Sequence, residues 1–153
     1  ERSPKYTPNF LFFKRLFGIA VILLGILVPF LTPRHSVVWE SYSPNKLEQA
    51  ASNGRFVIMD FYADWCIPCH ELDNETYRNE KVIEGLKDFV RLKINLTNPE
   101  DPELEKLIEK YNILGVPTIL FLDRQGGELK ELRQAGFVSA EEFLQILSQI
   151  TQK

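Results

Sequence analysis

The sequence has few cysteines, no excess of basic residues and no repeated or low-complexity tract. Only two of its 153 residues are cysteine, and 18 Lys and Arg stand against 21 Asp and Glu, which gives a formal net charge of −3. Because phosphate binding needs a clustered basic face, this composition excludes a nucleic-acid-binding protein. Its 44% hydrophobic and 25% charged residues are typical of one globular domain with a modest appendage.

The longest uncharged run covers residues 16–33 and reads LFGIAVILLGILVPFLTP. At about 1.5 Å per residue this run would reach roughly 27 Å, close to the thickness of a bilayer's hydrocarbon core. We therefore expect a transmembrane helix at 16–33, a cytoplasmic or inter-helix segment at 1–15 and a folded domain at 34–153. A secretory signal peptide and a buried core helix are the alternatives, although no small-x-small cleavage site follows the run and the run has no polar face.

Basic residues flank this apolar run asymmetrically. Four of them precede it, and only Arg34 follows it closely. Under the positive-inside rule this pattern keeps the N-terminus cytoplasmic and places the domain on the other side of the membrane. Because the sequence begins at Glu1, we expect either a processed chain or part of a longer one.

The rest of the sequence alternates between strand-like and helix-like segments. Apolar and β-branched runs predict strands, and amphipathic runs predict helices. Alternation of this kind, ending in a hairpin turn at 123–127, predicts the α/β class with a mixed sheet and helices on both of its faces. The predicted strands are 36–42 (a strand or an extended arm), 56–62, 89–96, 119–122 and 128–132, and the predicted helices are 44–52, 66–77, 81–87, 102–111 and 139–150.

The two cysteines, Cys66 and Cys69, lie where a buried strand gives way to a helix. A thiol at a helix N-terminus has its thiolate stabilised by the helix dipole and by unpaired backbone N–H groups, so Cys66 is the predicted nucleophile. Cys69 follows nearly one turn later, close enough to attack a mixed disulfide and release the partner. Pro68 is compatible with the first helical turn, because backbone N–H groups there have no acceptor within the helix and proline lacks only this group. The pattern predicts exchange with protein thiols and disulfides, without a cofactor.

The stretch FVIMDFYADWCIPCH at 56–70, with Gly-Val-Pro-Thr at 115–118, resembles the thioredoxin superfamily. The resemblance covers residues 37–150 and implies a thioredoxin-like three-layer sandwich. It also implies that Pro117 is cis and sits beside the cysteine pair. Asp60 and Trp65 match the buried acid and the tryptophan of the family.

Within that superfamily, YADWC at 62–66 and NILGVPTILFLDRQGGE at 112–128 resemble the C-terminal domain of DsbD, the thiol:disulfide interchange protein. The resemblance implies a bacterial inner-membrane protein whose domain faces the periplasm or the cell exterior. Its partners would be other DsbD-type domains or exported redox proteins, such as a disulfide isomerase or a factor of cytochrome c biogenesis. The several membrane spans and second cysteine pair of DsbD are not in this sequence. The residues implied to contact a partner are Trp65, Ile67, Pro68 and Val116.

Two carboxylates, Asp60 and Asp73, are expected beside the cysteines. Nearby negative charge would raise a thiol pKa and oppose the helix dipole. Asp60 lies in an apolar strand, and we hypothesise that it accepts the proton of Cys69 during exchange. Asp73 would tune the cysteine pair through its charge alone, and the alternative is an ordinary solvated helix residue.

Three other readings of the cysteines remain open. Cys66 to His70 satisfies C-x-x-C-H, the c-type haem attachment signature, but His35 and Met59 are poorly placed as a second axial ligand. Copper or zinc would find only two thiolates and one imidazole. A purely structural disulfide would close too short a loop to remove much chain entropy. Within the redox reading, acidic surroundings favour a reductase, whereas an oxidase would need a strongly stabilised Cys66 thiolate.

Overall fold

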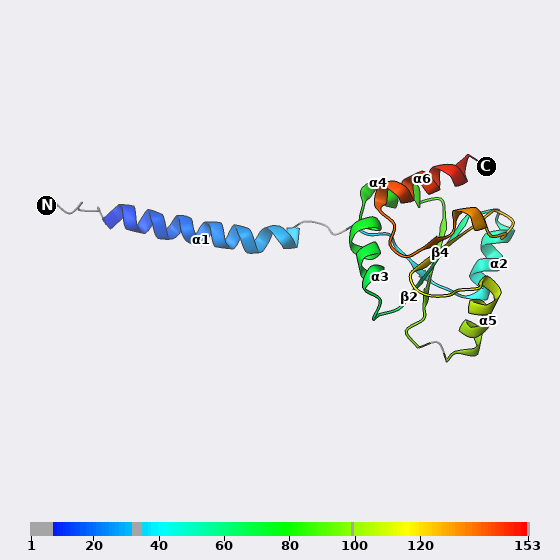
Figure 1. The fold of residues 1–153 in the computed structure, drawn as a ribbon. Coiled ribbons are helices and arrows are strands. Elements are labelled where there is room, and N and C mark those ends of the chain that lie inside the picture. The colour runs from blue at the N-terminus through cyan, green and yellow to red at the C-terminus, as the bar shows by residue number, and fades with distance from the viewer. Residues whose placement is uncertain (1–7, 32–34, 99, 153) are drawn as a thin grey trace. The chain divides into compact units, whose positions relative to one another are not determined.

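The computed structural model describes residues 8–31, 35–98 and 100–152, and the chain divides into two compact units, 1–34 and 35–153. Helix α1 (Pro8–Leu31) makes up the described part of the first unit (Figure 1). It is a 24-residue helix, and its described large apolar side chains, from Phe12 to Leu27, are exposed.

The predicted membrane span falls partly on this helix. Residues 32 and 33 of the span, like residues 1–7 of the segment before it, lie outside the described residues. In the part of the chain that the structure describes, no helix is both long enough and apolar enough to cross a membrane.

The second unit is built on a mixed sheet in the order β1-β3-β2-β4-β5. Strands β1 and β2 both run parallel to β3, while β4 runs antiparallel to β2 and to β5. This arrangement confirms the predicted α/β class and mixed sheet. The strands are β1 (Glu40–Ser41), β2 (Val57–Tyr62), β3 (Val90–Asn95), β4 (Thr118–Leu122) and β5 (Gln134–Ala135).

Helices cover both faces of this sheet and complete three layers (Figure 1). One core lies under α2 and α5 and includes Met59 and Leu120, while the other lies under α3, α4 and α6 and includes Ile58 and Phe143. Successive residues of β2 enter opposite cores, as the two-residue period of a strand requires. The helices are α2 (Pro44–Ser52), α3 (Ile67–Glu71), α4 (Glu80–Gly85), α5 (Pro102–Tyr111) and α6 (Ala140–Thr151).

Capping side chains set the starts of several of the predicted helices. Ser43 and Asp101 accept hydrogen bonds at the N-termini of α2 and α5, each followed by a proline. Ser139 and Glu142 form a reciprocal capping box at the start of α6. These side chains satisfy backbone N–H groups that the first helical turn leaves unpaired.

The predicted strand at 128–132 is wrong. Only Glu128 pairs there, in an isolated bridge to Leu122, and a 3-10 turn, η2 (Lys130–Leu132), follows. A strand would send Leu129 and Leu132 to opposite faces, because they are three residues apart. The helical turn lets both pack against one core. Pairing with β4 resumes only at β5.

The predicted helix at 66–77 is interrupted. Helix α3 ends at Glu71 and continues as a wider π-helical turn, η1 (Leu72–Thr76), where the Tyr77 N–H donates to the Leu72 carbonyl over 2.9 Å. Such turns insert one extra residue into a helix and recur at functional sites. Leu72, Thr76 and Tyr77 are all buried here, and the Thr76 hydroxyl donates to the Val138 carbonyl over 2.6 Å.

Candidate redox site

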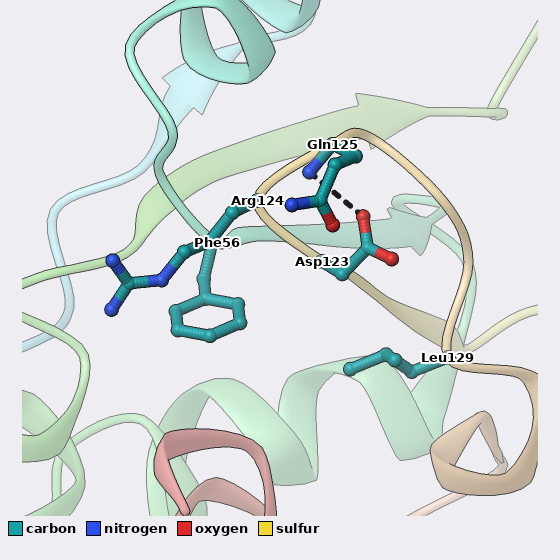
Figure 2. A pocket seen from close by; sticks show the side chains of 5 residues that line it. All are labelled: Phe56, Asp123, Arg124, Gln125 and Leu129. Carbon is teal, nitrogen blue, oxygen red and sulfur yellow. Dashed lines mark hydrogen bonds between the residues drawn. The ribbon is translucent and has the colours of Figure 1, made fainter. Parts of the chain in front are cut away.

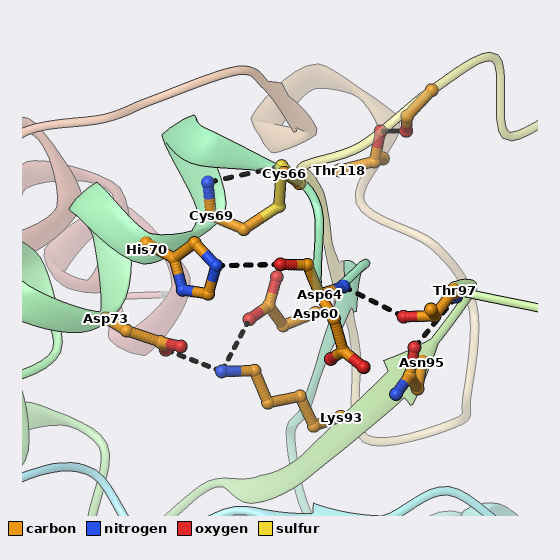
Figure 3. The surroundings of a disulfide bond; sticks show 11 residues. Asp60, Asp64, Cys66, Cys69, His70, Asp73, Lys93, Asn95, Thr97 and Thr118 are labelled. Atoms are coloured by element: carbon orange, nitrogen blue, oxygen red, sulfur yellow. Dashed lines mark hydrogen bonds and ion pairs between the residues drawn. A yellow bond between two sulfur atoms is a disulfide. The ribbon is translucent and has the colours of Figure 1, made fainter.

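The two cysteines lie just beyond the C-terminal end of β2 and are joined in a disulfide (Figure 3). Their sulfur atoms are 2.06 Å apart and their Cα atoms 5.3 Å apart. Cys66 is the N-cap of α3, and its sulfur accepts a hydrogen bond from the Cys69 N–H over 3.2 Å. The predicted placement at a helix start is therefore confirmed. Both residues are almost fully buried, with exposed fractions of 3% and 4%.

Large apolar side chains surround the buried disulfide. Trp65, Ile67 and Pro68 are exposed, as contact with a partner protein would require. Val116 is half-buried and packs against Ala63 and the two cysteines. Leu114, which was not predicted as a contact residue, is 90% exposed and lies two residues before Val116 in the chain. Its place directly before Gly-Val-Pro-Thr was the only sequence feature that could have indicated such a role.

The loop that carries Pro117 is held beside the end of β2. The Val116–Pro117 peptide bond is cis, as the resemblance implies. The Thr118 hydroxyl donates to the Gly115 carbonyl over 2.7 Å, and the Gly136 N–H donates to the Pro117 carbonyl over 2.9 Å. Thr118 also pairs with Phe61 of β2, so the sheet fixes where this loop meets the cysteines.

Asp60 is buried in β2, with an exposed fraction of 2%. It lies in register with Lys93 of β3, whose ammonium is 3.8 Å from an Asp60 carboxylate oxygen and 2.5 Å from one of Asp73. Burial raises the pKa of Asp60 from 3.8 to about 7, because desolvation disfavours its charged form. The Lys93 charge opposes this rise, and the Asp73 charge adds to it. Both predicted carboxylates thus belong to one cluster in the surroundings of the disulfide (Figure 3).

Sequence reasoning missed two members of this cluster, Lys93 and Tyr77. Burial raises the pKa of Tyr77 well above its usual value of 10, so its hydroxyl stays protonated. A basic residue inside an alternating strand was the only signal for Lys93. Its partner cannot be read from that pattern, because strand register is set by the folded sheet.

His70, the last residue of the C-x-x-C-H pattern, does not join the cysteines. Its Nε2 is 2.9 Å from the Asp64 carbonyl oxygen (Figure 3). His35 is exposed and Met59 is fully buried in the core. Among the residues that the structure describes, no group of three His, Cys, Asp or Glu side chains is arranged to hold a metal ion.

A cavity of about 230 Å³ lies at the other end of β2 (Figure 2). It is lined by the Asp123–Gln125 turn, Leu129 and Phe56, and the Arg124 guanidinium lies 4.8 Å from the centre of the Phe56 ring. The cavity lining includes no cysteine, so this end of β2 serves as an internal reference for the redox end.

Comparison with known proteins agrees with this geometry. A family model described as a thioredoxin-like domain matches residues 43–151. The thiol:disulfide interchange protein DsbD of Actinobacillus pleuropneumoniae serotype 5b is 40% identical over 100 residues, which are 65% of this chain and 17% of that protein. The chain thus spans about one sixth of the length of the curated relatives it matches.

Solved structures give the same result. The oxidised C-terminal domain of DsbD from Neisseria meningitidis is 26% identical with a TM-score of 0.59, and the match covers 74% of this chain and 99% of that one. A thioredoxin from Thermus thermophilus is 28% identical with a TM-score of 0.63, over 76% of this chain and 88% of that one. The chain belongs to the thioredoxin-like family.

Proposed function

We propose that residues 34–153 form a thiol:disulfide oxidoreductase domain that works through Cys66 and Cys69. The observation that carries this proposal is the Cys66–Cys69 disulfide, which caps a helix beside the cis Val116–Pro117 loop. The similarity to DsbD proteins, whose name describes thiol:disulfide interchange, supports the same activity.

Exchange proceeds in two displacements. The Cys66 thiolate attacks a partner disulfide, which forms a mixed disulfide and releases one partner thiolate. Cys69 then loses its proton and attacks the Cys66 sulfur, which closes the Cys66–Cys69 disulfide and releases the second partner thiolate. Two electrons pass from the domain to the partner. Asp60 accepts the Cys69 proton, since a carboxylate with a pKa near 7 exchanges protons readily at neutral pH.

The exposed side chains around the disulfide receive the partner protein. Trp65, Ile67 and Pro68 offer exposed surface, and the half-buried Val116, next to the cis Pro117, packs against the two cysteines. Asp73 acts more indirectly, through its ion pair with Lys93. The partners are disulfide-bonded or dithiol proteins, among them other DsbD-type domains and exported redox proteins.

We further propose that the domain is a reductase tethered to a bacterial inner membrane and facing the periplasm. The 18-residue uncharged run at 16–33 and the basic residues before it support the tether and its orientation. The buried acid near the cysteines supports the direction, because negative charge disfavours the thiolate on which a strong oxidant depends.

The equilibrium potential of the Cys66–Cys69 couple, measured against glutathione, tests both activity and direction. A value below about −200 mV supports a reductase, and one near −120 mV would exclude it. Cys69→Ser should trap a mixed disulfide with a partner, and Cys66→Ser should trap none. A Soret band or bound copper in the purified chain would favour the haem or copper alternatives instead.

A further inference from the structure

The Lys93 ammonium is surrounded by rings as well as by carboxylates. Its nitrogen lies 4.8 Å from the centre of the Tyr62 ring, 5.6 Å from that of Trp39 and 5.8 Å from that of Tyr77. An ammonium over an aromatic face is attracted by the ring's negative face, more strongly when water is excluded. Three rings and two carboxylates therefore determine together where this charge sits.

Trp39 comes from a part of the chain outside the strand and helix that carry the acids. It belongs to the segment 35–42, which precedes α2 and enters the sheet as β1. The Val37 N–H donates to the Tyr77 carbonyl over 2.9 Å, and the Tyr42 N–H donates to the Lys93 carbonyl over 3.2 Å. The Trp39 ring meets Tyr77 edge to face, with 4.9 Å between the ring centres. Backbone bonds on both sides thus hold Trp39 over Lys93.

Several buried polar atoms of this cluster are not fixed in place by close hydrogen bonds. Trp39 Nε1, Asp60 Oδ1 and the Tyr77 hydroxyl are buried, and none of them has a partner in close hydrogen-bond geometry among the described residues, although Asp60 and Tyr77 lie near enough to shift each other's pKa. The Lys93 ammonium is within hydrogen-bond distance of Asp73 but 3.8 Å from Asp60. Since the Lys93 ammonium and Asp60 are 3.8 Å apart, too far for a short hydrogen bond that would fix their distance, this distance also depends on how the rings hold the ammonium.

We propose that Trp39 is a positioning residue that keeps the Lys93 ammonium close to Asp60 and so sets how readily Asp60 takes up and releases a proton. The effect of Trp39 on the protonation of Asp60 does not depend on the proposed function. Only the consequence for thiol-disulfide exchange rests on it. This role of Trp39 would make the segment that leads into the domain part of the machinery that tunes the redox site.

A cavity of about 290 Å³ gives Lys93 somewhere to move. Trp39, Asp73, Tyr77, Arg78 and Lys93 all line it. Without the Trp39 indole, the Lys93 ammonium could move into this cavity. It would stay paired with Asp73, and its distance from Asp60 would increase. The other charges near Trp39 and Lys93 are Arg78, which repels the ammonium, and Glu40, which is already paired with Lys46 over 3.0 Å.

The sign of the effect follows from the charges. Lys93 lowers the pKa of Asp60, so moving Lys93 away raises that pKa further. More Asp60 is then protonated at neutral pH, and less of it is available as a base. The Asp60 titration midpoint and the base-dependent arm of the exchange rate should both move to higher pH.

The test uses Trp39→Leu in the full chain. The Asp60 midpoint is followed by carbon NMR of the labelled carboxyl group, and exchange is followed as the rate at which the reduced chain reduces oxidised glutathione between pH 5 and 9. We expect both midpoints to rise by roughly 0.5 pH unit or more. Trp39→Phe, which keeps an aromatic face, should restore most of the wild-type midpoint, and Trp39→Met should behave like Trp39→Leu if the leucine variant does not fold.

Phe56→Leu is the matched control. Phe56 is also a half-buried ring beneath a cation, Arg124, but it lies at the other end of β2 (Figure 2). It should leave both midpoints unchanged. In a Lys93→Met background, Trp39→Leu should cause no further shift, because its effect acts through Lys93.

Unchanged Asp60 midpoints in the folded Trp39 variants would overturn the inference. So would an equal shift in Phe56→Leu, or a full shift that persists without Lys93. A wild-type chain that does not exchange with glutathione would contradict the proposed function instead, and the NMR titration would still decide the role of Trp39.

Discussion

The domain contains two partly buried ion clusters that differ in how completely they are hydrogen-bonded. Glu128 accepts two hydrogen bonds from the Arg133 guanidinium, over 2.7 and 2.9 Å. Arg133 also donates to the Tyr111 carbonyl over 2.7 Å and to that of Asn112 over 3.4 Å. In the other cluster, one Asp60 oxygen has no partner within hydrogen-bond distance among the described residues, and the other oxygen lies 3.8 Å from the Lys93 ammonium.

The difference between the clusters shows that hydrogen bonds determine whether a buried carboxylate is held in one arrangement. A fork-shaped guanidinium that meets a carboxylate with two bonds holds both groups in one charged arrangement. Here it also fastens the C-terminal end of α5, at Asn112, from which the chain runs to the cis-Pro loop. Asp60 is buried without such bonds, so its charged and neutral forms are nearly balanced at neutral pH. The Glu128 carboxylate is held by two hydrogen bonds, whereas the Asp60 carboxyl group is poised to change its protonation state near pH 7.

Removing the guanidinium should give the largest effect. Arg133→Ala leaves the Glu128 carboxylate buried without its cation and frees two helix-end carbonyls, so we expect a loss of about 3 kcal/mol in the free energy of unfolding. Urea denaturation of the wild type and the variant measures this loss. Arg133→Lys keeps the charge but not the fork, and should recover only part of it. A loss below about 1 kcal/mol would show that the Glu128 cluster is not structural.

Neutralising one acid in each cluster should act with opposite signs. Asp60→Asn removes a charge that burial disfavours, so it should stabilise the domain above pH 7, by on the order of 2 kcal/mol. Glu128→Gln weakens a charge-assisted pair and should cost about 2 kcal/mol at the same pH. Denaturation at pH 8 compares the two variants.

The pH dependence gives the sign check for Asp60. Its pKa is raised from 3.8 to about 7, so between these values the folded state binds more protons than the unfolded state. The Asp60 contribution to stability is complete below pH 4 and is lost as pH rises through 7. Asp60→Asn should remove that slope, whereas an equal slope in the variant would mean that another group causes it.

An exposed ion pair should give the smallest change in the free energy of unfolding. Lys106 and Glu103 are 3.5 Å apart on the surface of α5, where water screens their attraction. Lys106→Ala should change the free energy of unfolding by less than about 0.5 kcal/mol, measured by the same urea titration. A larger loss would mean that an ion pair stabilises this domain even when it is exposed, so burial and hydrogen bonding would not explain the difference between the two clusters.

Much of the local structure could be predicted from the sequence. Ser43, Asp101 and Ser139 start helices because their side chains satisfy nearby backbone groups, an interaction within a few residues. The 128–132 stretch was wrongly predicted as a strand, because the core that buries Leu132 is built by distant segments. The π-helical turn after Glu71 depends in the same way on where Tyr77 is buried.

The sequence by itself determined where the cysteine pair lies, since two cysteines three residues apart at a strand-to-helix junction already place one of them at the start of a helix. Only the tertiary structure decided which charge accompanies the buried acid. The parallel register of β2 and β3 places Lys93 beside Asp60, and the segment 35–42 brings the Trp39 ring to the Lys93 ammonium. Register and segment packing arise from contacts across tens of residues, so local pattern cannot specify them.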